Sequence, residues 1–224
     1  MTNSETLPHT SEQIQADVQN AIKWEPLLNA AEIGVAVNDG VVTLSGSVDS
    51  YAKKLEAENA TKAVRGVKAI VEGIKIIFND KYGKKTDNDI AKEVLNAFVW
   101  HRDITNDTIQ VKVEDGWVTL EGEQQWNYQR EAAGVAIRNL TGIRGISNKI
   151  TINPQPADDI EQHDIANALH RNRFIDDKNI VVQVNGKKVT LTGSVTSWYD
   201  RDEAARIAWN APGVSSLANE LAVL

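Results

Sequence analysis

A sequence pattern of about 75 residues occurs three times along this chain of 224 residues, and no other feature constrains the fold as strongly. The segment DGVVTLSG at residues 39–46 returns as DGWVTLEG at 115–122 and, reading as if one residue were inserted, as NGKKVTLTG at 185–193. The closing glycines lie 76 and then 71 residues apart. A second glycine with an apolar neighbour follows 20 residues after each: Gly66-Val67, Gly142-Ile143 and Gly213-Val214. Such a fixed period predicts tandem copies of one small domain.

Each copy is expected to begin with a helix, because apolar residues recur at helical spacing along one face. These residues are Ile14, Val18, Ala21 and Ile22, then Ile90, Val94, Ala97 and Phe98, then Ile165, Ala168 and Leu169. N-caps are expected at Thr10 or Ser11, Thr86 or Asp87, and Asp158 or Asp159.

A hairpin should follow, because two alternating segments flank an Asp-Gly or Asn-Gly pair. The first strand carries Ile33, Val35 and Val37, or Ile109, Val111 and Val113, or Ile180, Val182 and Val184. The turn glycines are Gly40, Gly116 and Gly186. The closing glycines Gly46, Gly122 and Gly193 are expected to face the second helix and let it come close.

The second helix should bury a face rich in alanine and end at Gly66, Gly142 or Gly213. Its apolar residues are Ala57, Ala60, Thr61 and Val64, then Ala133, Ala136, Ile137 and Leu140, then Ala204, Ile207, Ala208 and Ala211. A last strand carries Ile70, Ile74 and Ile76, or Ile146, Ile150 and Ile152, or Leu217, Leu221 and Val223, and its wide first gap suggests a bulge.

The predicted fold is therefore α+β: three tandem αββαβ domains, each a mixed three-stranded sheet with two helices on one face. We expect a flexible tail over residues 1–11, domains over 12–79, 88–153 and 158–224, and linkers over 80–87 and 154–157.

The net charge of −7 and the absence of a basic stripe argue against nucleic acid as a partner. The chain has no cysteine, so thiolate nucleophiles and disulfides are excluded. No run of 18 apolar residues is present, so no transmembrane segment is expected. The first residues lack the basic and apolar regions of a signal peptide, which predicts a cytoplasmic location, or a periplasmic one if a longer precursor exists.

The order of elements, the DGxVTLxG hairpin and the later Gly-Val or Gly-Ile pair resemble the BON domain, named for bacterial osmotically inducible and nodulation proteins. The resemblance covers nearly the whole chain outside its first dozen residues, and it extends to soluble triple-BON proteins. It implies a non-enzymatic module of osmotic or envelope stress that associates with phospholipid membranes or protein partners. A related BON protein senses potassium, so a potassium-responsive sensor is the alternative.

Catalytic and metal-binding patterns are not found. His163 and His170 lie seven residues apart, whereas helical metal pairs use a spacing of four with a third ligand nearby. We therefore predict no catalytic residues, no metal site and no cofactor other than possible potassium.

The six tryptophans outnumber the three phenylalanines. Trp24 and Trp100 close the first helix at equivalent positions, where the third copy has Phe174 or Ile175, and are expected to cap the core. The residues proposed for a lipid- or partner-binding surface are Trp117, Trp126, Trp198 and Trp209. Packing between domains is the leading expectation for some of these four, since each single sheet leaves one face open.

Overall fold

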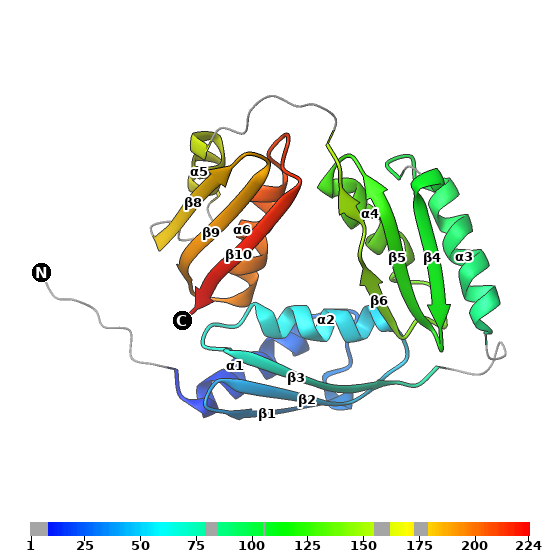
Figure 1. Ribbon diagram of the computed structural model, residues 1–224. Coiled ribbons are helices and arrows are strands. Elements are labelled where there is room, and N and C mark those ends of the chain that lie inside the picture. The colour runs from blue at the N-terminus through cyan, green and yellow to red at the C-terminus, as the bar shows by residue number, and fades with distance from the viewer. Residues whose placement is uncertain (1–8, 79–84, 105, 155–161, 173–178) are drawn as a thin grey trace, which may run out of the picture.

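The computed structural model describes residues 9–78, 85–104, 106–154, 162–172 and 179–224, and it confirms three αββαβ units (Figure 1). The first domain contains α1 (Ser11–Trp24), β1 (Ile33–Asn38), β2 (Val41–Val48), α2 (Tyr51–Lys62) and β3 (Ala69–Ile76). The second contains α3 (Asp87–Trp100), β4 (Ile109–Glu114), β5 (Trp117–Gln124), α4 (Asn127–Ile137), β6 (Gly145–Asn148) and β7 (Thr151–Ile152). The third contains α5 (Gln162–Arg171), β8 (Ile180–Asn185), β9 (Lys188–Val195), α6 (Trp198–Trp209) and β10 (Ser216–Val223).

The first helices begin where the sequence predicts. The side-chain oxygens of Thr10 and Thr86 accept a hydrogen bond from the backbone N–H three residues on, and the side chains of Gln13 and Asp89 complete capping boxes. Asp158 and Asp159, most of the expected tail, and Phe174 and Ile175 lie outside the described residues.

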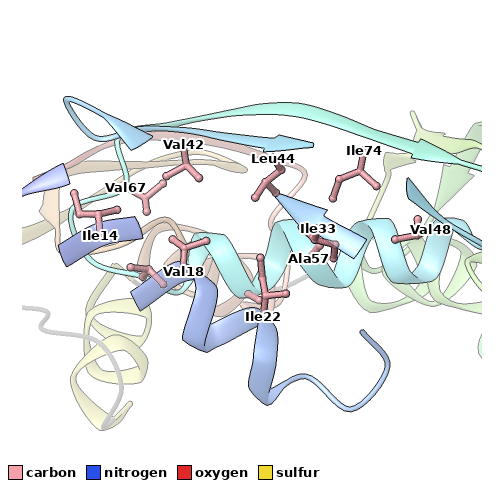
Figure 2. Packing of buried hydrophobic residues seen from close by; sticks show 12 residues of the cluster. Ile14, Val18, Ile22, Ile33, Val42, Leu44, Val48, Ala57, Val67 and Ile74 are labelled. Atoms are coloured by element: carbon pink, nitrogen blue, oxygen red, sulfur yellow. The ribbon is translucent and has the colours of Figure 1, made fainter. Parts of the chain in front are cut away.

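Every sheet is mixed, as expected. The middle strand pairs antiparallel with the first strand and parallel with the third, and in the second domain the third strand is split into β6 and β7. One helical face of α1 and the alanine face of α2 bury the inner side of the first sheet. Figure 2 shows Ile14, Val18 and Ile22 of α1 meeting Ala57 of α2 beneath Val42 and Leu44.

The third hairpin differs from the prediction of an inserted residue. Asn38 pairs with Val41, and Asn185 pairs with Lys188, so both loops have two residues and nothing is inserted. The glycine has moved from the second turn position to the first. Asp39 and Gly40 both have positive φ, as a type I′ turn requires, whereas only Gly186 does in the third copy, as in type II′.

The expected role of the closing glycines is wrong. Gly46 is exposed and does not lie under α2; a Cβ atom there would stand 2.0 Å from the carbonyl oxygen of Glu32. The corresponding distances are 1.9 Å from Gly122 to Thr108 and 1.8 Å from Gly193 to Asn179. All three glycines also have φ between +116° and +128°, which other residues rarely adopt. Glycine is therefore needed here because the backbone just before the first strand passes too close for a Cβ atom.

The predicted bulge in the third strand is also wrong for the first and third domains. Residues of β3 pair one to one with β2, and those of β10 pair one to one with β9. The gap between Ile70 and Ile74 arises because a polar residue, Glu72, occupies the inward position between them. Asn148 and Asn219 stand at the same place in the other two copies.

The three domains are arranged head to tail around a common centre (Figure 1). The second helices α2, α4 and α6 and the third strands β3, β6 and β10 lie on the inner side, and α3 and α5 lie at the periphery. In this view β3 runs toward the second domain and β10 runs back toward the first. Equivalent faces of the three second helices point toward this centre, in an approximately threefold arrangement.

Candidate functional site: exposed tryptophans and the helix junction

Trp24 and Trp100 are the most exposed tryptophans of the molecule. They end α1 and α3, and their side chains are 84% and 85% exposed, so the expectation that they cap the core is wrong. The buried faces of these helices already end one half-turn earlier, at Ile22 and Phe98. The indoles therefore extend past the last core residue into solvent.

Each of these indoles has apolar and basic neighbours. Leu27 is exposed just beyond Trp24, and Val99 is exposed beside Trp100. Lys23 precedes Trp24, and His101 and Arg102 follow Trp100. Exposed apolar side chains grouped in this way mark surfaces that bind partners or membranes more often than isolated ones do.

Trp117 and Trp126 are partly exposed. Trp117 lies on the open side of the second sheet, 52% exposed, and its ring covers Gly145: a Cβ atom on that glycine would lie 2.3 Å from the ring. Trp126 is 38% exposed at the start of α4, where its backbone N–H donates to Gln129 Oε1 at 3.0 Å. Part of the Trp117 ring is thus used for local packing.

Trp198 and Trp209 lie at contacts between domains. Trp198, the first residue of α6, packs against the core of the first domain, and its Nε1 is buried without a hydrogen-bond partner among the described residues. Trp209, at the end of α6, packs on the core of its own domain, and the Arg130 guanidinium of the second domain lies 4.4 Å from its ring centroid. This placement agrees with the expectation of packing between domains.

The interdomain contacts repeat around the ring. Tyr51, the first residue of α2, packs against the core of the second domain, as Trp198 packs against that of the first. Asn127 holds the equivalent position in α4 and is 97% buried. The sequence pattern does not single out Tyr51 and Asn127. The signal it holds is that the residues five positions after each closing glycine lie off the alanine face.

Arg130 shows how the second copy departs from the others. Its counterparts hold the third strand of their own domain: Lys54 Nζ donates to Ile74 O at 3.1 Å, and Arg201 Nε donates to Leu221 O at 3.1 Å. Arg130 instead reaches the neighbouring domain through Trp209. Burial lowers the pKa of Arg130, and Glu131 opposes this effect.

A cavity of ≈ 570 Å³ lies between the three second helices. Each helix contributes the residues nine and thirteen positions after its closing glycine: Leu55 and Asn59, Glu131 and Val135, Asp202 and Arg206. Tyr51 and Tyr199 complete its aromatic lining. The cavity is therefore a product of the threefold arrangement.

Several charged groups at or beside this cavity are paired. Lys62 Nζ lies 3.7 Å from Asp202 Oδ2 across the contact between α2 and α6. A hydrogen bond from Arg206 lowers the pKa of Glu203, and the same bond raises the pKa of Arg206, with Glu131 of the second domain adding to that rise. Such pairing suits a domain interface better than a site for a charged ligand.

Among the described residues no group of three His, Asp or Glu side chains could hold a metal ion, and His163 and His170 are both exposed on α5. In the same part of the chain, no helix combines the length and apolar character needed to cross a bilayer.

Two solved structures that match this chain have low sequence identity to it. CdsD, a structural protein of the type III secretion system of Chlamydia trachomatis, is 16% identical with a TM-score of 0.26, covering 93% of this chain and 91% of that one. The C-terminal domain of CdsD gives 16% identity and a TM-score of 0.25, covering 96% and 100%. These scores are too low to indicate a shared overall arrangement.

The sequence comparisons are more specific. Osmotically-inducible protein Y of Escherichia coli (strain K12) is 26% identical over 189 residues, covering 75% of this chain and 94% of that protein. A family model of the BON domain matches residues 10–77, 86–154 and 157–224, one match for each αββαβ unit. The chain therefore belongs to the BON domain family.

Proposed function

We propose that this protein is a non-catalytic binding protein of the osmotic stress response that associates with phospholipid surfaces through Trp24 and Trp100. The similarity to an osmotically inducible protein supports the role in stress. The observation that carries the binding proposal is the exposure of both indoles at equivalent helix ends. Tryptophan favours the membrane–water interface, where its apolar ring and N–H group meet both environments.

The arrangement of the domains supports a shared binding face. A rotation about one axis keeps equivalent residues at the same level along that axis. The approximate rotation relating the first two domains therefore predicts that Trp24 and Trp100 face the same side of the ring. Two anchors on one surface bind more tightly than either alone, because the second binding event becomes intramolecular.

Co-sedimentation with phosphatidylcholine vesicles, with and without phosphatidylglycerol, tests this proposal. We expect the full chain to bind, and the double variant Trp24→Ala/Trp100→Ala to lose at least about tenfold in affinity, in line with the loss of two interfacial anchors. Because both side chains are almost fully exposed, the variant should keep its fold.

Trp117→Ala is the matched control, since it removes one half-exposed indole from the sheet face. It should retain most of the binding. If it abolishes binding while the double variant binds normally, the binding surface is the open side of the second sheet. If no vesicle composition binds the full chain at low salt, the lipid proposal is wrong and a protein partner becomes the better candidate.

Potassium binding stays a prediction based on resemblance alone. Backbone carbonyl groups would be the ligands, so a specific cation should raise the melting temperature by binding the folded state. Equal melting temperatures in potassium chloride and sodium chloride at the same ionic strength would exclude it.

A further inference from the structure

One position on the third strand, six residues after the second glycine of each copy, carries Glu72, Asn148 or Asn219. Asn148 is exposed, whereas Glu72 and Asn219 are partly buried. All three side chains make one bond in common. Glu72 Oε1 accepts from Ile74 N at 2.8 Å, Asn148 Oδ1 from Ile150 N at 3.3 Å, and Asn219 Oδ1 from Leu221 N at 3.3 Å. Glu72 Oε1 therefore accepts the same hydrogen bond as the amide oxygens of the two asparagines.

The two asparagines also make a second bond, which needs a donor. Asn148 Nδ2 donates to Arg130 O at 2.6 Å, and Asn219 Nδ2 donates to Arg201 O at 2.9 Å. The equivalent carbonyl in the first domain belongs to Lys54 of α2. An ionised carboxylate can only accept hydrogen bonds, so it cannot repeat this contact.

The second oxygen of Glu72 lacks the hydrogen bond that the asparagine Nδ2 atoms make. Glu72 Oε2 is buried and has no hydrogen-bond partner among the described residues. A buried acceptor without a donor is costly, and an ionised one more so. Protonation turns that oxygen into an O–H donor and gives the carboxyl group the same pattern as the asparagine amide.

The charged groups around Glu72 come from α2. Lys54 Nζ lies 3.9 Å from Glu72 Oε1 but donates its hydrogen bond to Ile74 O, and Glu58 adds negative charge. β2 pairs Leu44 with Glu72, and the flanking Thr43 and Ser45 are uncharged. Burial is the main cause that raises the pKa of Glu72, with the Ile74 N–H and Lys54 opposing it.

We propose that Glu72 is a proton-binding site of the first domain, whose Oε2 carries a proton and donates to the Lys54 carbonyl oxygen as Asn148 and Asn219 do in the other domains. The proton joins the third strand to the second helix. Its loss leaves a buried negative charge beside an acceptor and weakens the first domain alone.

The direction of the pH dependence follows from linkage. A carboxyl group whose pKa is higher in the folded state contributes stability that is fully present below its unfolded pKa. That contribution is lost as the pH rises through the folded pKa. Each unit of difference changes the unfolding equilibrium constant about tenfold.

Carbon-13 NMR titration of the Glu72 carboxyl in the full chain tests the proposal, with Glu72→Gln giving the assignment. We expect a midpoint above the ordinary glutamate value of about 4.3. Glu72→Gln mimics the protonated group, so it should unfold at higher denaturant than the natural chain at pH 8, with the difference vanishing near pH 4. A midpoint at or below the ordinary value, or a variant less stable at pH 8, would overturn the proposal.

Two further variants separate the proton from general effects of charge. Asn219→Asp places a carboxyl group in the amide position of the third domain and should make that domain less stable at pH 8 than near pH 4. Glu220→Gln removes the exposed neighbouring carboxylate of β10 and should change neither pH dependence. Equal responses in Asn219→Asp and Glu220→Gln would contradict the proposed hydrogen bond.

Discussion

Two pairs of tryptophans in this molecule differ in their exposure to solvent and in their contacts with other domains. Trp24 and Trp100 end the first helices α1 and α3 and are exposed, whereas Trp198 and Trp209 begin and end the inner helix α6 and contact neighbouring domains. The two indoles of α6 thus hold domains together, whereas the indoles that end α1 and α3 remain exposed to solvent.

The largest effect is expected from Trp198→Ala. Truncating a buried aromatic residue costs about 3–5 kcal/mol, and this partly buried side chain should fall near the lower end, at about 3 kcal/mol. Urea denaturation measures the loss, and small-angle X-ray scattering should show a larger radius of gyration as the third domain separates from the first. Trp198→Tyr is the control, because Tyr51 fills the equivalent contact, and it should restore the compact form. An unchanged radius in the alanine variant would show that Trp198 does not join the domains.

A smaller effect is expected from the pair Arg130 and Trp209. A double-mutant cycle with Arg130→Gln and Trp209→Leu should give a coupling energy of about 1–2 kcal/mol, because burial strengthens a cation–π contact. Arg201 and Trp198 form the reference pair within one domain, at 5.2 Å between the guanidinium carbon and the ring centroid. If the Arg130 pair shows no coupling, the second and third domains are not joined at this point.

The smallest change in stability is expected from Trp24 and Trp100. Trp24→Ala and Trp100→Ala should each alter the free energy of unfolding by less than about 0.5 kcal/mol, since exposed substitutions rarely do more. The comparison is sharpest if the same variants lose vesicle binding. A destabilisation above about 1 kcal/mol would indicate that these indoles lie in a domain contact, and they would then not differ from Trp198 and Trp209.

The order of elements could be predicted because the repeat presents it three times. The apolar faces of α1 and α3, the mixed sheets and the alanine faces of the second helices are all confirmed. Periodicity reports which residues face a core, and burial of those residues dominates the folding of each domain.

The remaining errors have a common physical origin. The sequence pattern predicts a helix-packing role for Gly46, but the constraint comes from the carbonyl oxygen of Glu32, in the short 3-10 helix that precedes β1, and no local pattern reveals that contact. Glu72 was hidden by an apparent gap between isoleucines, because a buried polar residue breaks the pattern without breaking the strand. Trp24 and Trp100 looked like core residues because hydrophobicity alone does not tell a buried indole from an exposed one.

The head-to-tail contacts also have a consequence for how many molecules assemble. Contacts between unlike surfaces end only when the series closes on itself; otherwise they continue into open chains. Here closure occurs within one polypeptide, when Trp198 returns to the first domain. A fragment that stops after residue 154 would lack two contacts. The surface of the first domain that Trp198 covers and the face of α4 that carries Arg130 would both be exposed. Such a fragment would carry complementary ends, and we expect it to associate into open chains that the contact of the third domain with the first prevents in the full chain.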